Sequence, residues 1–432
     1  MKHKRYIRLW IKQGIICIFI ITLFNALNSI RVSAENNVYI IGGGEEVYNY
    51  QDLLNRYEIN SPAYNRNSLT YQIEALNGTI SSETYDGYSN QWAGISQTIT
   101  ELNSTREELI AYKNLILAQE DADNTILLEE IDDQIAEVDA QIEMYSSSMN
   151  SVKENTAEAK LQKEISSFYS IYQQELIRKG QRLLKNDFLK SCYALIINKE
   201  QIDYYNSYQE YLDTAYEVET IKYKKGVSTQ EKVNNASIDI QQNETSKLKY
   251  QNSYDTTLKS IQTETGISKN VALRFDMSFY EKNYDEDQTF YQFINCDTDY
   301  MQLLSLVACY QNYLGLDGMT SDAVYKQVGL QIQDYQLQIE ELTNNIKTYV
   351  GVAIRSYHSA FRAKETAQNI LSAKEENCRI VKAMLDNKKA TILELKKAYV
   401  DKESAEITYY QCCYEIIVWE NIIENGLYGA SP

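Results

Sequence analysis

Histidine is nearly absent from this sequence, and its scarcity excludes most catalytic and metal chemistry. The 432 residues include two histidines, His3 and His358. His3 lies in a stretch expected to be cleaved, and one remaining histidine cannot complete a Ser/His/Asp, Cys/His or zinc arrangement. We therefore predict no enzyme, no cofactor and no metal site.

Residues that break regular structure are equally rare. Two prolines and 16 glycines interrupt the whole chain, which favours long helices over many short strands. Tyrosine is abundant, at 37 residues against 9 phenylalanines, and it suits helix faces that are buried on one side and hydrated at the rim. The composition predicts an all-α fold.

The amino terminus has the pattern of a targeting signal at residues 1–34. Five basic residues precede an apolar run from Gly14 to Phe24, which is too short to span a bilayer comfortably, and Ala34 fits a cleavage site. An uncleaved membrane anchor is the alternative. Cleavage removes six basic residues and no acidic ones, which changes the net charge from −18 to −24. We expect so acidic an exported protein to have no nucleic-acid partner.

Two short stretches have the features of turns between helices. They are KKGVSTQE at 224–231 and KKATILE at 388–394. Gly226 can adopt the left-handed conformation that ends a helix. Ser228 with Glu231, and Thr391 with Glu394, have the spacing of a capping box, in which a hydroxyl and a carboxylate satisfy the first backbone N–H groups.

The two turns lie at matching places in an internal repeat. Residues of like type recur at an offset of 162, pairing Thr229, Val233 and Ala236 with Thr391, Leu395 and Ala398. Self-similarity at so long a period indicates duplication of one supersecondary unit. Here that unit is predicted to be a helical hairpin.

The repeated pattern resembles the TolC family of outer-membrane efflux and secretion channels. The likeness is carried by Lys222 to Gly266 and Leu385 to Gly426, each with a basic tip, a Ser/Thr-x-x-polar start, a Tyr-rich turn of helix and a final glycine. The resemblance implies the fold of a TolC-like α-barrel protomer. In it, paired short helices lie beside one long helix in each of two duplicated halves.

A heptad pattern marks a further hairpin before the first repeat. Apolar residues alternate spacings of three and four at Leu128, Ile131, Ile135, Val138, Ile142, Tyr145, Met149 and Val152. This is typical of a left-handed coiled coil. The partner is predicted at 95–116, although Arg106 and Lys113 interrupt its seam, and 122–125 is the expected turn.

The chain is thus predicted to have six segments. They are a signal peptide at 1–34, an amino-terminal segment with a first short helix at 35–94, the inserted coiled-coil hairpin at 95–156, the first TolC-like hairpin at 157–266, a connector at 267–294 and the second hairpin at 295–432.

Finer boundaries are predicted inside these segments. Val38 to Gly44 is expected to be a flexible start rather than a phosphate loop, because two glutamates follow it. A helix is expected from Glu46 to Tyr57, the next one from Pro62 to Gly78, and a polar connector at 79–94. From about Ala157 to Lys225 the pattern indicates one unbroken helix.

The positions where family channels insert membrane strands do not carry a strand pattern. A lipid-facing strand needs roughly ten residues with alternating apolar side chains. In the second half only Gly315 to Thr320 is available, and in the first half residues 79–156 have a heptad period. The prediction is therefore a helical conduit with little or no transmembrane β-barrel.

The resemblance implies an export function. We expect a homotrimer in the extracytoplasmic envelope, or in the outer membrane as the family implies. Its tips would dock onto a membrane-fusion adaptor bound to an ABC or RND exporter. The predicted docking residues are Gly226, Val227, Ser228, Thr229, Ala390, Thr391 and Ile392, with Asp386 as a charge at an aperture.

Two alternatives to this function remain open. In the first, the tip residues simply terminate and cap helices, a role that is compatible with docking. In the second, the whole chain is a structural or adhesive coiled-coil protein of the envelope without transport activity. The matched turns favour the conduit, because a scaffold needs no such pair.

Overall fold

The computed structural model describes residues 38–42, 46–118, 125–267, 271–316 and 322–432, and these are predominantly helical, as predicted. The expected signal peptide lies outside them. The chain forms two compact units. Unit 1 comprises the described residues up to Ser61, Phe188–Asn283 and His358–Ile416, and unit 2 comprises Pro62–Asp187, Tyr284–Tyr357 and Ile417–Pro432. No helix in the described ranges is both long and apolar enough to cross a membrane.

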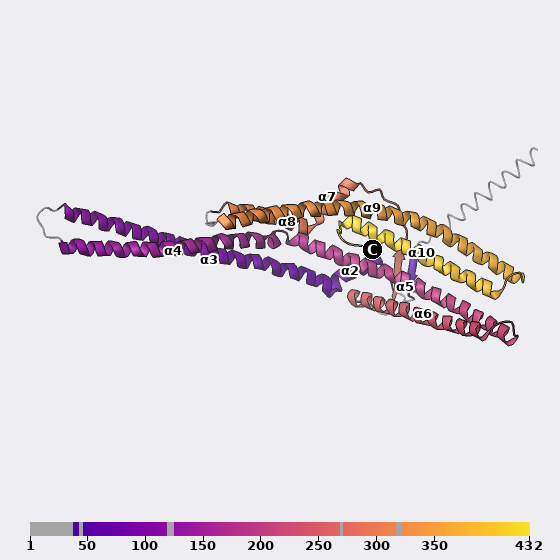
Figure 1. The fold of residues 1–432 in the computed structure, drawn as a ribbon. Coiled ribbons are helices and arrows are strands. Elements are labelled where there is room, and N and C mark those ends of the chain that lie inside the picture. Colours follow the sequence, from indigo (N-terminus) through magenta and orange to yellow (C-terminus); the bar gives the residue numbers. More distant parts are fainter. Residues whose placement is uncertain (1–37, 43–45, 119–124, 268–270, 317–321) are drawn as a thin grey trace, which may run out of the picture. The chain divides into compact units, whose positions relative to one another are not determined.

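Two helical hairpins supply most of unit 1 (Figure 1). The first joins the end of α5 (Gln173–Lys224) to α6 (Gln230–Thr265), and the second joins the end of α9 (Asp322–Asp386) to the start of α10 (Ile392–Asn425). The sequence pattern predicts helices from Gln230 to Thr265, from Ser321 to about Asn387 and from Thr391 to Glu424. The predicted bounds of α6 are therefore confirmed, and those of α9 and α10 agree to within one residue. Both repeats therefore fold as hairpins, as the 162-residue offset indicates.

A small sheet in unit 1 corrects the expectation of a flexible start. β1 (Val38–Ile41) pairs antiparallel with β3 (Val271–Asp276), which pairs parallel with β2 (Glu46–Asn49). The predicted helix at Glu46 begins four residues later, as α2 (Tyr50–Asn60). Tertiary contacts decide this, because Phe275 of β3 is fully buried and its ring lies 5.2 Å from that of Tyr193 on α5.

Unit 2 contains a longer helical pair than the sequence predicted. α3 (Pro62–Leu117) and α4 (Thr125–Ile171) run antiparallel, and the predicted polar connector at 79–94 is part of α3. Gly78, which was expected to end a helix, marks close packing instead. A Cβ there would lie 3.1 Å from the carbonyl oxygen of Ser166. Packing against α4 thus outweighs the helix-breaking tendency of glycine, which costs about 1 kcal/mol per residue.

The two interruptions of the heptad seam are explained by ion pairs between α3 and α4. Arg106 Nε lies 2.6 Å from Asp139 Oδ1, and Lys113 Nζ contacts Asp132 Oδ1. The basic side chains therefore leave the apolar seam and bind acids on the facing helix. Ile131 and Val152 of the predicted seam are buried. A left-handed supercoil for this pair stays a prediction.

The helix predicted to be unbroken from Ala157 to Lys225 bends at Tyr172, between α4 and α5. Backbone hydrogen bonds continue through the bend, since Tyr172 N donates to Phe168 O at 2.9 Å. One turn earlier, the Ser166 and Ser167 hydroxyls donate to the carbonyls of Gln162 and Glu164, each at 2.7 Å. Such bonds from serine to the preceding turn commonly bend helices.

Two shorter helices complete unit 2. α7 (Glu286–Cys296) occupies the end of the predicted connector, and α8 (Thr298–Leu314) agrees with the short helix that the sequence pattern predicts from Asp297 to Leu314. α8 packs on α4, where Asn312 Nδ2 donates to Glu164 Oε2 at 3.3 Å. The predicted turn at 122–125 lies outside the described residues except for Thr125, and of the turn that the sequence pattern predicts at 315–318 the described residues include Gly315 and Leu316.

Candidate functional site

The two predicted turns lie in one unit and at the same end of it (Figure 1). Residues 225–229 form the first turn and residues 387–391 form the second turn. The hairpins are in direct contact, because Lys396 Nζ of α10 donates to the carbonyl oxygen of Glu210 on α5 at 3.2 Å. The structure thus brings together the tip residues that the repeat predicted.

The first turn ends α5 with a Schellman motif. Gly226 has φ +73°, in the left-handed region that side chains disfavour. Its N–H donates to Tyr223 O at 2.9 Å, and the N–H of Val227 donates to Lys222 O at 2.9 Å. These are the two bonds by which a left-handed residue satisfies the last helical carbonyls. The predicted role of Gly226 as a helix terminator is confirmed.

The second turn repeats the motif with lysine in place of glycine. Lys388 has φ +56°, and it is the one non-glycine residue with positive φ in the described chain. Its N–H donates to Leu385 O at 2.9 Å, and the N–H of Lys389 donates to Met384 O at 2.7 Å. Sequence reasoning missed this conformation, although the 162-residue offset places Lys388 opposite Gly226.

The helix starts after the two turns differ in chemistry. In the first turn the cap is Thr229, whose hydroxyl accepts from Lys232 N at 3.4 Å. The capping box predicted for Ser228 and Glu231 is wrong. Ser228 instead donates to Glu219 Oε2 at 2.8 Å, which joins the turn to α5. The register of the repeat explains this, since it matches Thr229, and not Ser228, with Thr391.

In the second turn the predicted capping box is present. Thr391 N donates to Glu394 Oε2 at 2.6 Å, and Glu394 N donates to Thr391 Oγ1 at 3.2 Å. The bond from the Thr391 backbone lowers the pKa of Glu394 below its ordinary value, with help from the Thr391 hydroxyl. The carboxylate therefore stays ionised at the positive end of α10.

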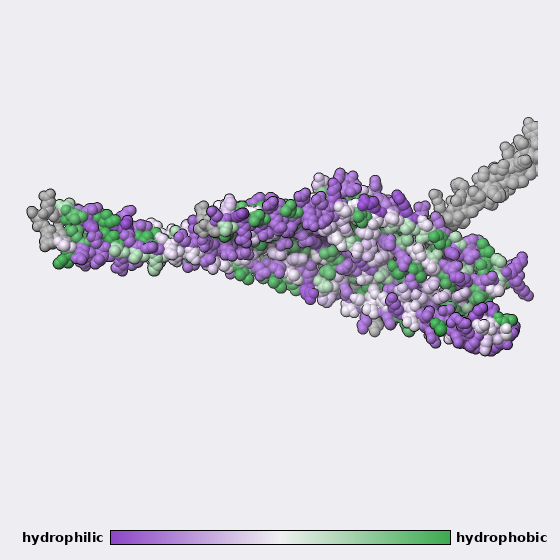
Figure 2. Space-filling model, in the orientation of Figure 1, coloured by the Kyte–Doolittle hydropathy of each residue, from purple (hydrophilic) through white to green (hydrophobic). Residues whose placement is uncertain are grey.

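Apolar side chains at both turns face solvent. Val227 is 72% exposed and Ile392 is 49% exposed, although aliphatic residues at helix ends usually pack inward. Figure 2 shows apolar patches beside hydrophilic ones at these tips. Ala390 is half-buried, and Asp386 is an exposed carboxylate at the last residue of α9. An acid is unfavourable there, because the carboxyl end of a helix carries negative potential.

A second feature of unit 1 is a carboxylate cluster that sequence reasoning missed. Carboxylate oxygens of Glu200 on α5 and of Glu403 and Glu406 on α10 lie within 4.8 Å of one another. Tyr39 Oη donates to Glu200 at 2.5 Å, and Lys402 Nζ lies 2.7 Å from Glu406 and 3.6 Å from Glu403. The hydrogen bond from Tyr39 and the ion pairs with Lys402 thus account for the cluster, and it gives no ground for assigning a metal.

Burial changes the protonation of this cluster. It raises the pKa of Glu403 to about 7, reinforced by the neighbouring carboxylate of Glu406 and opposed by Lys402. Burial also raises the pKa of Glu200, while the Tyr39 hydrogen bond opposes the rise. The contact between α5 and α10 therefore holds one carboxyl group, that of Glu403, which gains or loses a proton near neutral pH. Nothing in the sequence pattern predicts that Glu200 lies beside Glu403 and Glu406, which come about 200 residues later in the chain.

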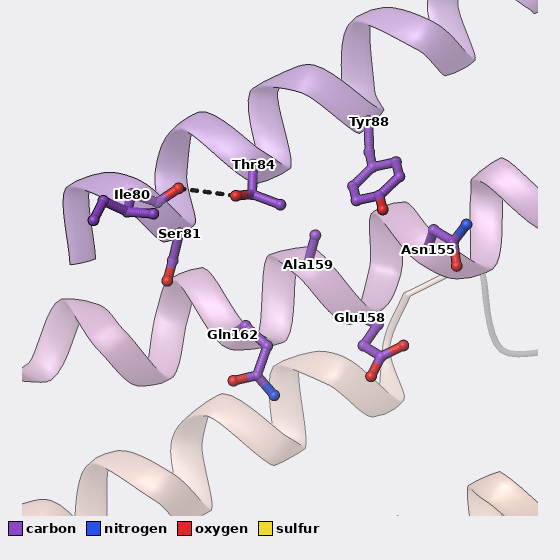
Figure 3. Close-up of a pocket in the computed structure, with 8 residues that line it drawn as sticks. All are labelled: Ile80, Ser81, Thr84, Tyr88, Asn155, Glu158, Ala159 and Gln162. Carbon is purple, nitrogen blue, oxygen red and sulfur yellow. Dashed lines mark hydrogen bonds between the residues drawn. The ribbon is translucent and has the colours of Figure 1, made fainter. Parts of the chain in front are cut away.

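A groove of about 250 Å³ lies between α3 and α4 in unit 2 (Figure 3). It is lined by Ile80, Ser81, Thr84, Tyr88, Asn155, Glu158, Ala159 and Gln162. Its serine and threonine hydroxyl groups are already bonded, since Thr84 donates to Ile80 O at 3.0 Å and Ser81 lies 3.0 Å from Ser166 Oγ. This groove can seat a side chain, but it presents no catalytic arrangement.

The remaining histidine is engaged in an ordinary contact. His358 Nδ1 lies 2.6 Å from Glu281 Oε1 in unit 1. The prediction that the chain is not an enzyme stays a prediction.

Comparison with known proteins finds likeness in structure only. No protein-family model matches the sequence, and no curated protein matches it. Solved structures similar to this chain include the MtrE outer membrane channel of Neisseria gonorrhoeae, with 11% identity, a TM-score of 0.44 and coverage of 63% of this chain and 71% of that one.

Two further structures show the same degree of likeness. The CmeC outer membrane channel of Campylobacter jejuni has 10% identity, a TM-score of 0.41 and coverage of 64% and 67%. The outer membrane protein VceC of Vibrio cholerae has 9% identity, a TM-score of 0.40 and coverage of 65% and 77%. These proteins are of the class that the tip motifs resemble. Sequence identities and TM-scores this low say nothing about function. Any functional assignment therefore has to be argued from the residues of this chain.

The left-handed lysine gives a first prediction. Replacing Lys388 with glycine removes the Cβ penalty of this conformation, so we expect Lys388→Gly to stabilise the protein by about 1 kcal/mol. Gly226→Ala, the matched change in the other turn, is expected to destabilise it by a similar amount. Urea unfolding followed by circular dichroism measures both. Equal destabilisation by the two variants would contradict the assigned conformations.

The carboxylate cluster gives a pH prediction. A carboxyl group whose pKa is raised from 4.5 to about 7 in the folded state makes the protein lose stability as pH rises between these values. Glu403→Gln cannot ionise. We expect it to be more stable than wild type at pH 8, on the order of 1 kcal/mol after allowance for partial exposure, with the difference fading toward pH 4.

The control for this measurement is Glu365→Gln, which changes an exposed acid on α9 in the same unit. Its thermal stability should follow that of wild type at every pH. A pH-independent effect of Glu403→Gln would show that Glu403 ionises normally.

Proposed function

We propose that this protein is a TolC-like component of an export assembly. Copies of the chain, three by analogy with the family, form a helical conduit in the extracytoplasmic envelope. The turns dock onto a membrane-fusion adaptor bound to an ABC or RND exporter. The observation that carries this is the pair of exposed, left-handed turns, matched at 162 residues and placed together at one end of unit 1.

The turns have the features that tip-to-tip docking needs. A Schellman motif leaves small side chains and a rigid backbone at the surface, so a partner turn can approach closely. Val227 and Ile392 offer exposed apolar contact. Ser228, Thr229, Ala390 and Thr391 are small enough to leave that contact open. Asp386 would add a charge beside it.

An unpartnered stripe on α3 supports assembly from several copies. Leu69, Ile73, Leu76 and Ile80 follow the heptad spacing, and each is 56–62% exposed. Between Arg66 and Glu83 the one charged residue is Glu74. Apolar residues at this spacing on an uncharged face are typical of helix–helix contact.

Two further exposed leucines, Leu330 and Leu337, lie on α9 in the same unit, but Asp334 lies between them on the same helix face. Copies of a chain with net charge −18 repel one another wherever acids face acids. The α3 stripe is therefore the better face for the approach of another copy, and the groove beside Ile80 (Figure 3) can receive a neighbouring side chain.

The alternative function is a structural or adhesive protein of the envelope. The exposed stripe on α3 suits this function as well as a conduit. The matched turns favour the conduit, because a scaffold gains nothing from two left-handed tips at the same end. A measurement of adaptor binding distinguishes the two functions, because only the conduit requires it.

Bulky substitutions at the turns test the docking. We expect Gly226→Trp and Thr391→Trp each to weaken capture of a membrane-fusion adaptor from the same organism by at least about tenfold, because an indole fills the space that a partner turn must enter. Tyr399→Trp, an exposed aromatic change on α10, is the control. Biolayer interferometry measures the affinity, and equal binding by all proteins would remove the tip-docking proposal.

Charge in the α3 stripe tests the assembly. We expect the protein without residues 1–34 to be a homotrimer, and Ile73→Glu with Leu76→Glu to be a monomer of unchanged helicity, because acids there repel the neighbouring copy. Leu115→Glu, an exposed aliphatic outside the stripe, is the control. Sedimentation equilibrium gives the masses. A monomeric wild type, or a trimeric double variant, would argue against this face.

A further inference from the structure

The two tips carry charge of the opposite sign to the rest of the protein. The whole chain has a net charge of −18. Between Lys222 and Lys232, however, four lysines stand against one glutamate. Between Lys382 and Lys397, five lysines stand against Asp386 and Glu394. Each tip is therefore a local basic region in an acidic protein.

Some of these lysines serve the hairpins themselves. Lys222 binds Glu219 at 2.5 Å, Lys396 binds the backbone of Glu210, and Lys397 binds Asp401 at 2.8 Å. Two pairs at the turns have no such role. The side chains of Lys224, Lys225, Lys388 and Lys389 make no ion pair or hydrogen bond with any described residue.

The backbone of the second turn adds an independent observation. Lys388 occupies a left-handed position that glycine fills in the matching turn. A lysine there costs about 1 kcal/mol relative to glycine, and no ion pair or hydrogen bond of its side chain with a described residue offsets this cost. Residues held in such sparsely populated backbone conformations cluster at ligand-contact and switch regions.

We propose that the two lysine pairs recognise carboxylates on the docking turn of the partner, which flank an exposed aliphatic residue. This rests on the proposed function, and it specifies the chemistry of the adaptor. Val227 and Ile392 contact the aliphatic residue, while Lys224, Lys225, Lys388 and Lys389 bind the acids around it. Like charge then excludes adaptors whose tips are basic.

A protein partner fits these tips better than an anionic membrane does. The large apolar side chains exposed between Lys222 and Lys232 and between Lys382 and Lys397 are those of Tyr223, Val227, Met384 and Ile392, whereas interfacial anchors bury a whole helix face. The acidic body of the protein also repels anionic lipid. A hairpin turn needs only the small contact area that the tips provide.

The test measures adaptor affinity by biolayer interferometry between about 0.1 M and about 1 M NaCl, where the screening length falls from roughly 10 to roughly 3 Å. We expect Lys224→Glu with Lys225→Glu, and Lys388→Glu with Lys389→Glu, each to weaken binding about tenfold at the lower salt and little at the higher. Lys249→Glu with Lys259→Glu makes the same charge change on α6 and should have no effect.

A second probe makes the test independent of any one adaptor. Two disulfide-stapled synthetic helical hairpins are identical except that leucine in the turn is flanked by glutamates or by lysines. The wild type should bind the glutamate hairpin more tightly than the lysine hairpin. The variant with Lys224→Glu and Lys225→Glu, and the variant with Lys388→Glu and Lys389→Glu, should each bind the lysine hairpin more tightly.

The outcomes separate this inference from the proposed function. If wild type and tip variants bind the adaptor equally at low salt, and neither hairpin is preferred, the charge recognition is overturned while docking stands. If the wild type binds no adaptor and neither hairpin, both are overturned. Tighter binding to phosphatidylserine vesicles than to either protein probe would assign the lysines to lipid and overturn the inference.

Discussion

The reversal of long helices is the constraint on which the rest of this structure depends. A helix ends with unsatisfied carbonyl groups, and a left-handed residue lets the next N–H groups reach back to them. All four helices of the repeat end this way, at Gly226, Gly266, Lys388 and Gly426. Because a left-handed residue ends each of these helices, both repeats form a hairpin although few of their residues are alike.

Local chemistry made much of the fold predictable. The start of α6 after Thr229 and the capping box of Thr391 with Glu394 depend on residues within one turn of each other, so their spacing is visible in the sequence. The wrong assignment of the cap to Ser228 came from the same local rule. The choice between two adjacent hydroxyls was made by Glu219, nine residues away on another helix.

Long-range contacts account for what the sequence did not show. β1 has four residues, and it becomes a strand because it pairs with β3. The cluster of Glu200, Glu403 and Glu406 exists because α5 and α10 pack together. Gly78 was read as a stop, whereas it permits close approach of α4. In the candidate site, the position and the register of the two turns were predictable from the sequence, but the left-handed conformation of Lys388 was not recognised.

The pairing of β1 with β3 has a consequence for the order of folding. Val38 lies opposite Asp276, 238 residues later in the chain. Closing so large a loop is entropically slow compared with forming the local hairpins. We therefore expect β1 to pair with β3 only after the first helical hairpin, which lies between them in the chain, has formed, so that the sheet is a late step that fixes helices already present.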